Sequence, residues 1–104
     1  MNIVNGLVLP PRRVEDESNA LATWELVLVE AIVLIQAEVG ESSAVASAVE
    51  QLDGVTSADV VTGPYDVIAR AEAESMDELG RMIVSRIQSV KGVTRTLTCP
   101  IVRL

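Results

Sequence analysis

A Gly-Val-Thr triplet occurs twice in this chain, and both copies stand at the same kind of junction. The first is Gly54-Val55-Thr56 and the second is Gly92-Val93-Thr94. Each follows a segment with apolar residues at helical spacing and precedes a run that suits a strand. Glycine favours the left-handed turn that ends a helix, whereas β-branched residues favour strands. The repeat therefore predicts two strand–helix–strand units in one chain.

The first unit begins with the apolar run Ile32–Ile35, which predicts a buried strand. Ser42 or Ser43 can cap the helix that follows, and a second strand is expected over 55–62. The apolar face of this helix consists of Val45, Val49 and Leu52.

The second unit opens with residues 65–74, where apolar and charged residues alternate as in a half-buried strand. Ser75 and Glu78 have the spacing of a capping box, which predicts the start of a helix. A last strand is expected over 93–102, where Pro100 fits an edge position. The alternating apolar residues are Val67, Ala69, Ala71 and Ala73, and the helical stripe is Leu79, Met82, Ile83, Ile87 and Val90.

The resulting order is strand, helix, strand, strand, helix, strand. It predicts an α+β fold of the ferredoxin-like βαββαβ type, a four-stranded antiparallel sheet with two helices on one face. The other sheet face then lacks a cover, and Ile68 lies among its polar residues. We expect a second subunit to bury this face, so a homo-oligomer is predicted.

Residues 1–28 differ in character from the rest of the chain. We expect Pro10-Pro11-Arg12-Arg13 to interrupt regular structure and Glu15-Asp16-Glu17-Ser18-Asn19 to form a solvated polar patch. We predict an N-terminal arm or extension over residues 1–28 and one folded domain over residues 29–104.

Composition narrows the chemistry that this chain can perform. A net charge of −7 argues against direct binding to nucleic acid, whose affinity depends on Lys and Arg. The chain has no histidine, the commonest general base and metal ligand, so we expect neither a metal nor another cofactor. A single cysteine, Cys99, fits the reducing cytoplasm, and the apolar run Leu26–Ala37 is too short to span a bilayer.

The most distinctive chemistry lies in Thr62-Gly63-Pro64-Tyr65-Asp66. Gly-Pro strongly favours a turn, but a structural turn needs neither a phenol nor a carboxylate. Two interpretations of Asp66 stay open, a ligand-binding carboxylate or one that bonds its own turn. Tyr65 is likewise either a ligand contact or a ring packed on the sheet or a subunit interface.

Several motifs, taken in order, resemble the effector-binding and oligomerisation domain of the Lrp/AsnC transcriptional regulators, often called the RAM domain. They are the opening apolar strand, Leu52-Asp53-Gly54-Val55, Val61–Val67 and Val90–Thr98. The resemblance covers residues 31–104 and implies an effector, usually an amino acid, bound where dimers meet in a ring, commonly an octamer. Matched residue by residue, it implicates Gly63, Tyr65 and Asp66 in ligand binding, together with Thr94 and Thr96.

Full-length members of that family carry an N-terminal helix-turn-helix domain, and no basic recognition helix fits the residues before the first strand. We therefore expect a small-molecule sensing and oligomerisation domain that modulates transcription indirectly. An alternative is a pure protein-interaction module that forms mixed assemblies with full-length Lrp/AsnC regulators. A small ferredoxin-like enzyme is less favoured, since without histidine the acid–base candidates are only Asp59, Asp66, Glu72, Glu74 and Tyr65.

Overall fold

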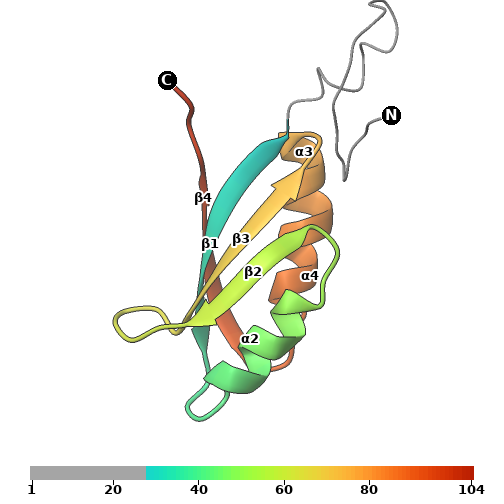
Figure 1. Cartoon of the computed structure of the whole chain (residues 1–104). Helices are drawn as coiled ribbons and strands as arrows, with labels where there is room; N and C mark the ends of the chain where they lie inside the picture. Colours follow the sequence, from blue (N-terminus) through green and yellow to red (C-terminus); the bar gives the residue numbers. More distant parts are fainter. Residues whose placement is uncertain (1–27) are drawn as a thin grey trace, which may run out of the picture.

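The computed structural model describes residues 28–104, so the predicted arm lies, apart from Leu28, outside the described residues. The described chain forms β1 (Val29–Ala37), α2 (Ser42–Glu50), β2 (Val55–Val60), β3 (Val67–Ala73), the consecutive helical segments α3 (Met76–Glu78), η1 (Leu79–Val84) and α4 (Ser85–Gln88), and β4 (Val93–Pro100). This order confirms the predicted ferredoxin-like α+β fold (Figure 1).

The four strands form one antiparallel sheet in the order β2-β3-β1-β4. The helices lie together on one side of this sheet, as the sequence predicted (Figure 1). β4 is an edge strand, so the missing N–H of Pro100 interrupts no second ladder. Among residues 28–104, no helix has the length and apolar character needed to cross a membrane.

The core lies between the sheet and the helices, and it follows the periodicity of each element. The β3 residues predicted to alternate toward one side are all buried, and small alanines among them let the helices pack close to the sheet. Leu79, Ile83 and Ile87 are buried from the second helical region. Among the side chains that the structure describes, the fully inaccessible ones are Ala31, Val33, Ile35, Val45, Val49, Val67, Ala69, Ala71 and Ile87.

The two helical regions begin differently. Ser75 caps α3 as predicted, because its Oγ accepts a hydrogen bond from the Glu78 N–H at 3.0 Å. In return, Glu78 Oε1 accepts one from the Glu74 N–H at 3.1 Å. The prediction of a serine cap for α2 was wrong, because Ser42 is already helical and Glu41 occupies the cap position without a side-chain bond. Burial of the apolar face therefore stabilises α2 without help from a side-chain cap.

The glycines of the repeated triplet have the predicted left-handed backbone, with φ of +93° at Gly54 and +96° at Gly92. A Cβ at Gly54 would lie 2.9 Å from Ile83 Cγ1 and closer still to Cδ1, so this glycine also permits close packing. Ile83 belongs to η1, a six-residue π-helical segment between α3 and α4 that the sequence did not predict. Hence one glycine of the repeat supports both a chain reversal and the contact with this helix.

The sheet face away from the helices has an apolar centre with charged groups at one end. Ile32, Leu34 and Ile68 are half-buried on this face, and Leu97 is 46% exposed. At one end, Glu30 pairs with Arg103 at 2.6 Å and with Arg70 at 3.6 Å. We call Ile32, Leu34, Ile68 and Leu97 the outer-face patch.

Candidate functional site

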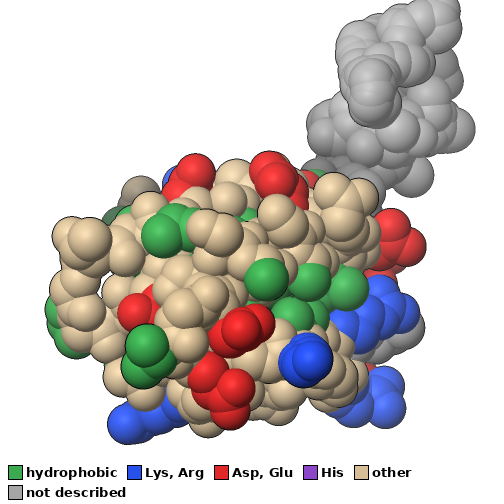
Figure 2. All heavy atoms as spheres, turned by 90° about the horizontal axis from the view of Figure 1, so that it is seen from below, with side chains coloured by type: hydrophobic (Ala, Val, Ile, Leu, Met, Phe, Trp, Pro, Cys, Tyr) green, Lys and Arg blue, Asp and Glu red, His purple; other side chains and the backbone are tan. Residues whose placement is uncertain are grey.

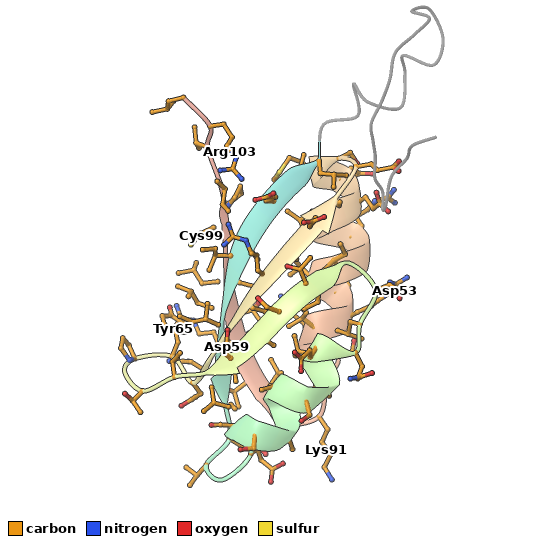
Figure 3. All side chains as sticks on the ribbon, in the orientation of Figure 1. Asp53, Asp59, Tyr65, Lys91, Cys99 and Arg103 are labelled. Carbon is orange, nitrogen blue, oxygen red and sulfur yellow. The ribbon has the colours of Figure 1, made fainter. Side chains whose placement is uncertain are left out.

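The turn formed by residues 61–66 joins β2 to β3 at one end of the sheet. A hydrogen bond from the Val61 N–H to the Asp66 carbonyl, 2.9 Å long, closes its base. Gly63 is exposed and has φ of +140°, a value that side chains rarely tolerate. Tyr65, which also belongs to the turn, is half-buried and lies at the edge of the molecule (Figure 3). The turn thus presents a glycine, a phenol and a carboxylate at one sheet end.

Asp66 caps the end of β1. The last pair between β1 and β3 is Ile35 with Val67, because the chain bends away before β3 begins. The N–H of Ala37 therefore has no strand partner there, and Asp66 Oδ2 accepts its hydrogen bond at 2.8 Å. The structure gives this oxygen a partner in the neighbouring strand rather than in its own turn. Within residues 28–104, Asp66 Oδ1 accepts no such hydrogen bond. Oδ2 is therefore occupied by the Ala37 N–H, and Oδ1 is available to another donor.

Gln36 also belongs to this candidate site, although the sequence patterns did not predict a role for it. Its side-chain Nε2 donates to the Pro64 carbonyl at 3.0 Å, and its own carbonyl accepts from Thr94 Oγ1 at 3.2 Å. The register between β1 and β4 shifts between Gln36 and Ala37, which marks a β-bulge at this point. The available signal was a single amide at the end of the apolar run Ile32–Ile35.

The two candidate threonines of β4 lie in different places. Thr94 is exposed and reaches the site through its bond to Gln36. Thr96 pairs with Ile35, whose side chain is buried on the helical side, and its Oγ1 accepts from Gln88 Nε2 of α4 at 3.0 Å. The structure therefore brings Gly63, Tyr65, Asp66 and Thr94 to one end of the sheet, and it turns Thr96 toward the helices.

Of the other acidic candidates, Asp59 lies near this turn, two residues before it on β2, and Glu72 and Glu74 lie far from it. Asp59 is exposed on β2, whereas Glu72 pairs across the sheet with Glu30, near the opposite end of β3. Glu74 lies just beyond the end of β3, before the second helical region. In the described part of the chain, no three Asp, Glu or Cys side chains gather in a way that could hold a metal ion.

A groove of about 560 Å³ lies elsewhere, on the helical side. It is open to solvent and is lined by Leu52, Arg81, Ser85, Arg86, Ser89 and Val90. Figure 2 shows Lys and Arg side chains gathered mainly on the right, which is the side of the helices in Figure 1. Arg81 is already paired with Asp77 at 2.8 Å. Since this groove contains none of the turn residues, it is separate from the site described above.

Two curated proteins are similar to this chain over very different shares of their length. An uncharacterized helix-turn-helix transcriptional regulator of Pyrococcus furiosus is 28% identical over 54 residues, which is 52% of this chain and 36% of the regulator. A homocitrate synthase of Sulfurisphaera tokodaii is 30% identical over 96 residues, which is 91% of this chain and 18% of the enzyme. This chain thus matches about a third of the regulator's length and a smaller part of the enzyme's.

Solved structures agree with the fold. The crystal structure of the protein TTHA0845 from Thermus thermophilus is 33% identical, has a TM-score of 0.67, and matches over 73% of this chain and 95% of its own. A transcriptional regulator of Neisseria meningitidis, solved in complex with L-Met, shares the fold at 16% identity with a TM-score of 0.65, over 95% of this chain and 62% of its own. The family model of the Lrp/AsnC ligand binding domain matches residues 30–103, and the chain therefore belongs to the Lrp/AsnC ligand-binding domain family.

Proposed function

We propose that this chain binds an amino acid or a similar small metabolite at the 61–66 turn, and that this binding changes its assembly with other subunits. The observation that carries this proposal is Asp66, which is fixed by the Ala37 N–H through one oxygen and has its other oxygen unbonded by any residue in 28–104. A carboxylate held in this way is preorganised for a cationic ligand group. The family match supports ligand binding as the class of function.

The groups around the turn suit the two ends of an amino acid. Asp66 Oδ1 accepts a charge-assisted hydrogen bond from an α-ammonium group. The main-chain N–H groups of Gly63 and Tyr65 are donors for an α-carboxylate, and the Thr94 hydroxyl adds a polar contact through the bulge. The related fold solved with L-Met supports an amino acid as the ligand class. Thr96 plays a lesser part in this proposal, since its hydroxyl is engaged by Gln88.

The outer-face patch is the proposed dimer interface. Ile32, Leu34, Ile68 and Leu97 form an apolar surface that the helices of the same chain do not cover. A second copy would bury this surface isologously, and dimers would then assemble further, up to an octameric ring. Leu97 lies at the centre of β4 opposite Leu34, so it is the most direct position at which to test this interface.

The effect on transcription is proposed to be indirect. The net charge of −7 disfavours contact with phosphates, so a partner would supply the DNA-binding surface. Similarity to a helix-turn-helix transcriptional regulator supports an indirect role in transcription. We also propose a cytoplasmic location, which fits the single cysteine of the chain. We propose ligand binding without catalysis, because the fixed contact of Asp66 is a main-chain amide rather than a second titratable group.

A second candidate function is a protein-interaction module that forms mixed assemblies with full-length Lrp/AsnC regulators. The exposed outer-face patch favours it, because a related subunit could cover the same surface as a second copy. Native mass spectrometry of this chain mixed with a full-length relative separates the two candidates. A mixed species that forms equally well with and without amino acids supports the interaction module alone.

The sensing proposal is tested by calorimetric titration of the whole chain with the twenty L-amino acids. Any amino acid that binds is then compared with its N-acetyl form, which lacks the ammonium, and with its methyl ester, which lacks the carboxylate. Both changes should weaken binding, and Asp66→Asn should weaken binding of the parent amino acid as well. Asp59→Asn is the matched control, since Asp59 is an exposed carboxylate on β2 outside the turn. Undiminished binding of the N-acetyl form would show that Asp66 does not hold the ammonium.

A further inference from the structure

A single hydrogen bond joins the tip of the turn, residues 62–65, to the rest of the described domain. Its base is closed by the Val61–Asp66 bond, and Asp66 also donates its N–H to the Ile35 carbonyl at 2.9 Å. Residues 62–65 have a single hydrogen bond to any other residue within 28–104, the one from Gln36 Nε2 to the Pro64 carbonyl. Pro64 has no N–H to donate, and the space around Gly63 is open, since a Cβ there would find no atom within 4 Å.

From this arrangement we propose that Gln36 is the positioning residue of the turn and links it to β4. The side chain of Gln36 holds the tip, and its main-chain carbonyl accepts the Thr94 hydroxyl from the other side of β1. The next residue, Ala37, is bonded to Asp66. Two consecutive residues of one strand therefore contact the tip, the carboxylate and the start of β4.

The bulge explains why this short segment can contact both neighbours. The register against β4 moves from Gln36 opposite Arg95 to Ala37 opposite Val93. Such a shift releases the strand from regular pairing, re-aims side chains and is common next to functional sites. Just beyond it, the Glu38 N–H donates to the Gly92 carbonyl at 2.8 Å, which ties the same strand end to the turn before β4. Gln36 therefore connects the tip of the turn to Thr94, and the bond from Glu38 connects the same strand end to Gly92.

The role assigned to Gln36 is distinct from that of Asp66. Asp66 caps β1 and lies at the base of the turn, whereas Gln36 acts on the tip and needs no contact with the ligand. The tip position and its link to β4 are properties of the free protein, and only the effect on affinity rests on the proposed function. Loss of Gln36 should leave the capping bond at Ala37 intact and release residues 62–65.

Nuclear magnetic resonance of the whole chain tests this separation. In Gln36→Leu, the heteronuclear NOE of the Gly63 and Tyr65 amides should fall, while the Ala37 amide keeps its protection from hydrogen exchange. Gln36→Lys places an ammonium donor near the Pro64 carbonyl and should restore much of the NOE. Gln88→Leu is the matched control, because Gln88 Nε2 also donates a 3.0 Å bond but to Thr96 on the helical side. Unchanged NOE values at Gly63 and Tyr65 in Gln36→Leu would overturn the assignment.

A second arm measures binding of whichever L-amino acid the wild-type chain takes up. Gln36→Leu should weaken that binding roughly two- to ten-fold, the range for losing one positioning hydrogen bond, and Gln36→Lys should recover most of it. Equal affinity in wild type and Gln36→Leu counts against the role in binding. If the wild type binds no amino acid, the sensing proposal fails, while the NOE comparison still decides whether Gln36 positions the turn. If Gln36→Leu does not fold, Gln36→Glu removes the same donor at the same size and gives the same readout.

Discussion

Replacing Asp66 in two ways separates its structural role from its proposed ligand role. Asp66→Ala removes the acceptor of the 2.8 Å bond from the Ala37 N–H and leaves that N–H without a partner at the end of β1. Asp66→Asn keeps an acceptor oxygen of the same reach and removes only the charge. The two variants therefore differ in the cap, and both lack the charge that would pair with an ammonium group.

The expected magnitudes follow from the bond that is lost. A hydrogen bond to an ionised group contributes about 1.5–3 kcal/mol, and the half-buried position of Asp66 favours the lower end, about 2 kcal/mol. In a domain of this size, that loss lowers Tm by roughly 8–16 °C. Asp66→Asn exchanges a charged for a neutral acceptor and should lower the free energy of unfolding by only about 0.5 kcal/mol.

The assay is urea unfolding followed by circular dichroism, with both variants and the wild type at one protomer concentration, because assembly makes stability concentration-dependent. Hydrogen exchange at the Ala37 amide provides a local readout. It should be protected in the wild type and in Asp66→Asn and should exchange rapidly in Asp66→Ala. Equal stability of Asp66→Ala and wild type would refute the capping role. Equal loss in both variants would show that charge, rather than the hydrogen bond, stabilises this end of the sheet.

Three further substitutions test separate parts of the account. Gly54→Ala places a Cβ against the Ile83 side chain at φ +93° and should lower the free energy of unfolding in urea by about 2–4 kcal/mol. Gly40→Ala is the control, because Gly40 has φ +83° with open space around it, and it should lower that free energy by only about 1 kcal/mol. Equal losses in the two variants would show that backbone strain alone matters. Ser75→Ala removes the cap of α3 and should lower the unfolding free energy by about 1 kcal/mol, and an unchanged value would mean that water replaces the cap. Leu97→Asp places a charge in the outer-face patch and should shift the mass in analytical ultracentrifugation toward the monomer with an unchanged far-UV spectrum; an unaltered mass would place the interface elsewhere.

Local patterns were sufficient to predict most of the fold. The alternation of Val67, Ala69 and Ala71 defined β3 and its buried side, because the side-chain period of a strand is two residues. The π-helical segment could not be predicted in this way. Leu79 and Ile83 are four residues apart, and this spacing is equally compatible with an ordinary α-helix.

The candidate site was only partly predictable, for a different physical reason. Gly63 and Asp66 could be proposed because turn chemistry is local, and the resemblance added a ligand class. The partner of Asp66 is the N–H of Ala37, 29 residues earlier, and this contact depends on where β3 begins relative to the end of β1. The bond from Gln36 to Pro64 likewise spans 28 residues. Contacts of this kind arise from strand register, which a single sequence does not specify at the resolution of one residue.

Native mass spectrometry of the whole chain, with and without each of the twenty L-amino acids, tests the sensing claim most directly, since it reports bound ligand and assembly together. We predict a homo-oligomer that retains at least one of these amino acids at its subunits and changes its distribution of assembly states when that amino acid is added. Asp66→Asn should lose both effects while keeping the oligomer. A wild-type chain that retains none of the amino acids and shows the same distribution with every one of them would contradict the claim.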